Sequence, residues 1–148
     1  MKKLFSIAAI VMIGALAFTS CKKSDNSSSN GSLKATAGST SVNSNYCIAT
    51  YSDSILSVFG ANVSSSNPFP YVSLSLLSWN GTAGTYAIDG FAVGADYIPG
   101  LTTTVPAVYG TITISTVAST QISGTFSFTC SDSTKVTNGS FTAKGTAL

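Results

Sequence analysis

An alternation of apolar and hydroxyl side chains over residues 121–131 restricts the fold of this chain more than any other feature. Every second position is apolar or small: Ile122, Gly124, Phe126, Phe128 and Cys130. The positions between them hold serine or threonine. A period of two places the apolar side chains on one face of a strand and the hydroxyls on the other. This pattern is typical of a half-buried antiparallel strand, which has one face on a core and one face in water.

Shorter segments of the same character follow one another from residue 33 onward, separated by glycine, proline, asparagine, aspartate and serine. The clearest are Tyr71–Trp79 and Val108–Ile114. Further strands are predicted at 33–37, 46–51, 55–61, 84–88, 91–97 and 135–144. Turns between strands are predicted at 67–70, 80–81, 89–90 and 99–100. About eight or nine strands at this spacing predict one all-β domain, an antiparallel β-sandwich or a small β-barrel.

The last predicted strand changes its apolar phase between Val136 and Phe141, across Asn138-Gly139. Asn-Gly favours a hairpin turn, but too little chain follows for a complete return strand. A β-bulge centred on the glycine is therefore the preferred interpretation.

The first 20 residues have the organisation of a signal peptide. Lys2 and Lys3 precede an apolar or small stretch, residues 4–18, that is shorter than a membrane span. Phe18-Thr19-Ser20-Cys21 follows, and small residues before a cysteine resemble the lipobox of bacterial lipoproteins. The resemblance implies cleavage before Cys21 and acylation of that residue, with palmitate among the usual chains. Two or three chains anchor a protein stably to a membrane. The alternative is an ordinary secretory signal with a chance cysteine.

The chain therefore divides into a signal peptide (1–20), the lipidated Cys21 with a flexible Ser/Asn/Gly linker (21–32) and the all-β domain (33–148). The run Ser20-Cys21-Lys22-Lys23 is similar to lipoproteins of the Bacteroidetes group. This likeness implies a lipid anchor in the outer membrane, and it leaves the periplasmic and the cell-surface sides both open.

The C-terminal half carries a second resemblance, over about 60 residues. It rests on four short segments: Gly84–Tyr86, Gly110–Ile114, Ile122–Phe128 and Thr137–Phe141. Together they look like small Bacteroidetes lipoproteins that are assigned to domain families of unknown function. The resemblance implies no known activity.

Several classes of function are excluded by residue types that the chain lacks. Arginine, histidine and glutamate are absent, and without the first 20 residues five lysines face five aspartates, for a net charge of zero. No basic stripe exists for nucleic acid. No Ser-His-Asp or Cys-His arrangement and no histidine-based zinc site can form. Asp89 and Asp96 are the nearest pair of carboxylates, and Asp89-Gly90 is a common turn dipeptide. We therefore expect no enzymatic activity, no metal and no cofactor.

Two cysteines remain once Cys21 carries lipid. Cys47 and Cys130 form an even pair, which in an oxidising compartment favours a disulfide. Such a bridge would close a long loop and stabilise the domain by about 4 kcal/mol on the chain-entropy model. The alternative is that each thiol is a small buried core residue, since Cys130 is in phase with Phe126 and Phe128.

Two further sets of candidate residues concern sugars. Tyr71 and Trp79 share one face of their predicted strand with serines, and an aromatic platform beside hydroxyls suits a sugar ring. The alternative is that Trp79 packs at the end of the sheet, and Tyr86, Tyr97 and Tyr109 fit either arrangement. Asp53-Ser54-Ile55 and Asp132-Ser133-Thr134 are similar to the Bacteroidetes O-glycan acceptor, which makes Ser54 and Ser133 candidate glycosylation sites.

Three functions remain. The preferred one is a membrane-anchored envelope lipoprotein with a non-catalytic structural or protein-interaction role. The alternatives are a glycan-binding surface lipoprotein and a barrel that holds an apolar small molecule. Thr-rich strands with almost no charge are poorly protected at sheet edges, so strand addition from an envelope protein is the expected mode of interaction.

Overall fold

The computed structural model describes residues 31–52, 54–62 and 66–147. These residues form an all-β domain without helices, as the sequence predicts. The ten strands are β1 (Ser32–Ala37), β2 (Thr40–Ser44), β3 (Tyr46–Ser52), β4 (Ile55–Ala61), β5 (Tyr71–Leu77), β6 (Gly84–Ile88), β7 (Val93–Gly100), β8 (Thr103–Ala118), β9 (Gln121–Cys130) and β10 (Lys135–Ala147). No helix in the described part of the chain has the length and apolar character of a membrane span.

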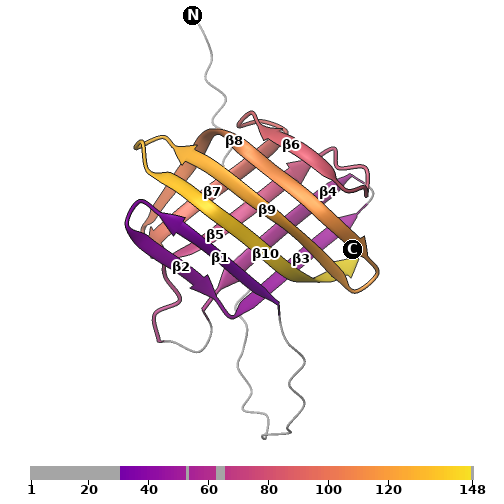
Figure 1. Cartoon of the computed structure of the whole chain (residues 1–148), viewed down its shortest axis with the longest axis horizontal. Coiled ribbons are helices and arrows are strands. Elements are labelled where there is room, and N and C mark those ends of the chain that lie inside the picture. The colour runs from indigo at the N-terminus through magenta and orange to yellow at the C-terminus, as the bar shows by residue number, and fades with distance from the viewer. Residues whose placement is uncertain (1–30, 53, 63–65, 148) are drawn as a thin grey trace, which may run out of the picture.

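The strands form two layers that are joined into a barrel (Figure 1). One layer has the order β2-β1-β10-β9-β8-β6, and the other has the order β3-β4-β5-β7. The long strand β10 pairs first with β1 and then, in parallel, with β3. The long strand β8 likewise pairs first with β7 and then with β6. These two shared strands close a barrel of seven strands, with β1, β2 and β6 as extensions.

The barrel interior is filled by the apolar side chains that alternate with polar residues along the strands. On β9 each residue from Ile122 to Cys130 that is in the apolar phase is buried, and the hydroxyl residues between them are exposed or half-buried. The largest fully buried side chains come from both layers: Trp79, Leu33, Leu56, Leu74, Leu76, Ile112, Ile114 and Ile122. Burial of apolar area of this kind is the main favourable term in folding.

The predicted bulge in the last strand is confirmed. The pairing of β10 with β9 shifts between Val136 and Gly139, and Asn138 has a φ of 53°. Asparagine tolerates this left-handed conformation better than most residues. Gly139 faces Phe126 so closely that a Cβ atom would overlap the phenyl ring, which explains why a glycine follows the asparagine.

The structure contains strand β2, which the sequence analysis did not predict, and starts β7 two residues later than expected. The later start follows from the turn at Asp89. One oxygen of the Asp89 carboxylate accepts hydrogen bonds from the backbone N–H groups of Phe91, Ala92 and Val93 at 2.8, 2.8 and 2.9 Å. These bonds hold the pKa of Asp89 below its ordinary value.

Candidate functional site

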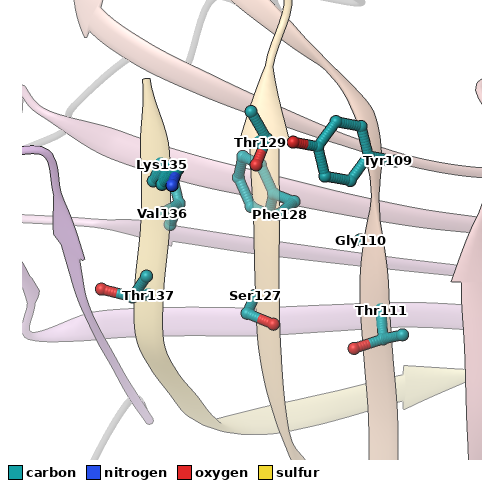
Figure 2. A pocket seen from close by; sticks show the side chains of 9 residues that line it. All are labelled: Tyr109, Gly110, Thr111, Ser127, Phe128, Thr129, Lys135, Val136 and Thr137. Carbon is teal, nitrogen blue, oxygen red and sulfur yellow. The ribbon is translucent and has the colours of Figure 1, made fainter. Parts of the chain in front are cut away.

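A groove on the outer face of the domain is the best candidate site (Figure 2). It lies over β8, β9 and β10, measures about 550 Å³ and is open to solvent on its outer side. We call it the outer groove. Its lining residues are Tyr109, Gly110, Thr111, Ser127, Phe128, Thr129, Lys135, Val136 and Thr137.

Two rows of side chains cross the groove. In the first row Thr129 on β9 is paired with Tyr109 on one side and with Lys135 on the other. Neighbouring strands lie about 4.8 Å apart, so the backbones at Tyr109 and Lys135 are separated by about 10 Å. Figure 2 shows the Tyr109 hydroxyl directed toward Thr129.

The second row supplies further hydroxyl groups. Thr111 is paired with Ser127 across β8 and β9, and both side chains are exposed. Thr137 lies on β10 within the bulge and is also exposed. The groove therefore offers one aromatic ring, one ammonium group and several hydroxyls that both donate and accept hydrogen bonds.

Two β-bulges give the outer groove its residues. The register of β8 against β9 shifts between Ala107 and Tyr109, and that of β10 against β9 shifts between Val136 and Gly139. A bulge bends its strand and redirects the side chains that follow. After the first bulge Tyr109 points outward and is 60% exposed, although Ala107, two residues earlier, is buried.

Lys135 is the one charged residue in the groove lining. Among the described residues it makes no ion pair. The neighbouring carboxylate of Asp132 accepts the N–H of Thr134 at 2.9 Å and is not part of the lining. The described residues contain no cluster of three or more histidine, cysteine, aspartate or glutamate side chains that could hold a metal ion.

The predicted aromatic platform of Tyr71 and Trp79 is not present, and this prediction is wrong. Strand β5 ends at Leu77, and Ser78 has a φ of 67°, which interrupts the alternation and turns the next side chain inward. Trp79 is therefore 1% exposed and lies in the core. Its indole N–H donates to the carbonyl of Thr82 at 3.0 Å, and its ring meets that of Tyr51 edge to face.

Tyr71 lies on the outer face of the β3-β4-β5-β7 layer, away from the outer groove. Its ring stacks on Phe69 with centroids 5.2 Å apart and meets Phe59 edge to face at 4.9 Å. The tyrosine is half-buried in this cluster. Both neighbours cover part of its ring, so the cluster is a packing arrangement of the outer face.

The predicted disulfide is also absent, because Cys47 and Cys130 are both free and buried. Cys47 packs in β3 and Cys130 ends β9, where each serves as a small apolar core residue. Burial raises the pKa of Cys47 to about 12. Burial and the charges of Asp132 and Asp96 raise the pKa of Cys130 to about 11. Both thiols are therefore protonated and unreactive at neutral pH.

Glycosylation at Ser54 and Ser133 and lipidation at Cys21 stay predictions. Ser54 and Ser133 are both exposed next to turns, where a glycan would meet no obstacle from the core. Ser133 has a φ of 71° and donates its N–H to the carbonyl of Cys130 at 2.9 Å. Cys21, the predicted lipid anchor, lies outside the described residues.

Sequence reasoning named Tyr109 only as one of several tyrosines and did not join it to Lys135. The alternation over Val108–Ile114 places Tyr109 on the same face as Thr111 and Thr113, but its position in one row with Lys135 depends on the pairing of β8 and β10 with β9. No protein-family model, curated protein or solved structure matches this chain.

Proposed function

We propose that this protein is a membrane-anchored envelope lipoprotein with a non-catalytic structural or protein-interaction role. The observation that carries the interaction role is the pair of uncharged edge strands, β2 and β6. In the described part of the chain, β2 pairs with β1 alone and β6 pairs with β8 alone. Neither strand contains a lysine, an aspartate or a proline.

Such edges present backbone N–H and C=O groups that a further strand can pair with. Natural edge strands are commonly protected by charge, proline or a covering segment, and β2 and β6 lack the first two. A partner that adds a strand gains backbone hydrogen bonds without needing a pocket. We therefore infer that the domain meets other envelope proteins by strand addition at β2 or β6.

The anchor is proposed from Cys21 and its flanking residues. Residues 22–31 separate Cys21 from the first strand, which begins at Ser32. Ten extended residues span at most about 33–36 Å, so an anchored domain would remain close to the outer membrane surface. The same reach applies on the periplasmic and the cell-surface side.

Intact-mass measurement of the protein purified from its native host, followed by peptide mapping, tests the anchor. A chain that begins at Cys21 and carries the mass of two or three acyl chains supports the proposal. An unmodified N-terminus contradicts it and indicates a secreted domain. The same map reports hexose on the peptides with Ser54 or Ser133.

Sedimentation velocity of the chain without residues 1–21 tests the edges. We expect self-association at high concentration, because one copy offers edge strands to another. Ala87→Lys on β6 and Ser41→Lys on β2 should reduce it, since charge on an edge opposes pairing. Thr125→Lys, exposed on the central strand β9, is the matched control and should associate like the wild type. A monomer at every concentration would argue against strand addition.

Two cavities lined by described residues bear on the apolar-ligand alternative, and neither supports it. The outer groove and a second hollow of about 520 Å³, lined by residues including Phe69, Pro99 and Leu101, both lie outside the barrel. Aromatic core side chains, including Phe126, Phe128 and Phe141, pack together in the interior.

A further inference from the structure

We propose that the outer groove binds a carboxylated sugar, such as a hexuronate residue of an acidic polysaccharide. In this arrangement the sugar ring lies on Tyr109, its carboxylate pairs with Lys135, and its hydroxyls bond to Thr129 between them and to the neighbouring row of hydroxyl side chains. This inference is independent of the lipid anchor and concerns a different face from the one that carries Tyr71.

The aromatic component is the exposed ring of Tyr109. It is one of the largest apolar exposures within a strand, at 60% of its surface, and no ring contact with another described aromatic side chain covers it. A sugar ring presents C–H groups that pack on an aromatic face, and tyrosine offers such a face with little rotamer entropy to lose. Its side chain lies on the same outer face as that of Thr111, two residues further along β8.

The charged component selects an acid. Lys135 provides the one ammonium group of the lining, with no carboxylate in the lining to neutralise it. An exposed ammonium pairs with a carboxylate through charge-assisted hydrogen bonds. A neutral sugar would offer this group hydroxyl oxygens but no opposite charge, whereas a sugar acid satisfies the ring, the charge and the hydroxyls together.

The dimensions fit one sugar unit within a longer chain. About 10 Å separates the backbones of Tyr109 and Lys135, and Thr129 lies between them. The side chains of Tyr109 and Lys135 extend over this gap and shorten it. Since the groove is open to solvent on its outer side, an internal residue of a polysaccharide can enter as well as a terminal one.

Isothermal titration of the chain without residues 1–21 tests the proposal. The probes are trisaccharides of galacturonate and of glucuronate, each compared with its methyl ester, which removes the charge and retains the rings. We expect at least one acid to bind about fivefold more tightly than its ester at low salt, with the difference decreasing as salt increases. Tyr109→Ala should weaken binding about tenfold, and Tyr109→Phe, which keeps the ring, should bind nearly as the wild type does.

Lys135→Gln should remove the preference for the acid over the ester. Lys144→Gln is its matched control, because Lys144 is also exposed on β10 but lies outside the groove lining. Equal effects of the two lysine variants would overturn the proposal, since they would indicate unspecific attraction. Absence of binding by the wild type to both acids, or equal affinity for acid and ester, would overturn it as well.

Discussion

Replacing Trp79 with alanine is expected to lower the free energy of unfolding by about 4 kcal/mol. The indole is 1% exposed and contacts the ring of Tyr51. Truncating a buried tryptophan or phenylalanine to alanine costs about 3–5 kcal/mol, because apolar contacts are lost and a cavity remains. The carbonyl of Thr82 loses the indole N–H that it accepts at 3.0 Å but keeps the hydrogen bond from the Tyr86 hydroxyl, so the lost hydrogen bond adds little to this cost.

Urea unfolding followed by far-UV circular dichroism measures this loss without using the removed fluorophore. With a denaturant slope of about 2 kcal/mol per molar, the midpoint should fall by about 2 M. Trp79→Phe keeps a ring in the cavity and should lose about half as much stability. Phe91→Ala is the control, because Phe91 is 77% exposed, and its effect should stay within about 0.5 kcal/mol.

A loss below about 1 kcal/mol for Trp79→Ala would refute the assignment of this residue to the core. Acrylamide quenching of the wild type gives an independent test, since Trp79 is the sole tryptophan of the chain. A buried indole should be quenched far less in the folded than in the urea-unfolded protein. Equal quenching in the two states would restore the exposed platform.

Three further predictions concern buried and hydrogen-bonded polar groups. Ser44→Ala should raise the free energy of unfolding by about 1 kcal/mol in urea titrations, because the buried Ser44 hydroxyl has no hydrogen-bond partner among the described residues. A loss of stability in this variant would contradict the prediction. Asp89 has a lowered pKa, so its contribution to stability is present above the ordinary value and is lost as the pH falls. Asp89→Ala should therefore lose less stability than the wild type between about pH 5 and pH 2, and equal losses would contradict the role of the carboxylate in the turn. Cys47 and Cys130 should resist a thiol reagent in the folded protein at neutral pH and react in denaturant, and labelling of either thiol in the folded state would contradict the core assignment. The folded pKa values of the two thiols are raised to about 12 and about 11. Their contribution to stability is therefore present below pH 9.0 and declines as the pH rises above it.

Local sequence patterns were sufficient for most of the strands. The bounds predicted for 55–61 and 84–88 agree with β4 and β6, and β9 follows the alternation over residues 121–131. The bulge at Asn138-Gly139 was also predictable, because the phase of the apolar residues changes there. These features depend on the period of side chains along a single strand, which the sequence contains directly.

The sites depended on contacts between distant segments. Trp79 turned into the core because Ser78 has a positive φ, and nothing in the residue types around it indicates that conformation. The number of cysteines allowed a disulfide between Cys47 and Cys130, but whether the two residues lie close enough to form one depends on their positions in the fold. The alternation of apolar and polar residues describes one strand at a time, so it predicts neither the burial of Trp79 nor the absence of the disulfide.

The sequence by itself determined that the chain forms an all-β domain, which face of each clear strand is buried, and that histidine-based catalysis is impossible. Only the tertiary structure decided that the layers close into a barrel, because closure rests on the pairing of β10 with β3 and of β8 with β7. The outer groove has the same origin. Tyr109, Thr129 and Lys135 belong to three strands, and their register brings them into one row. Register is set by the whole barrel, since every strand must satisfy its neighbours on both sides.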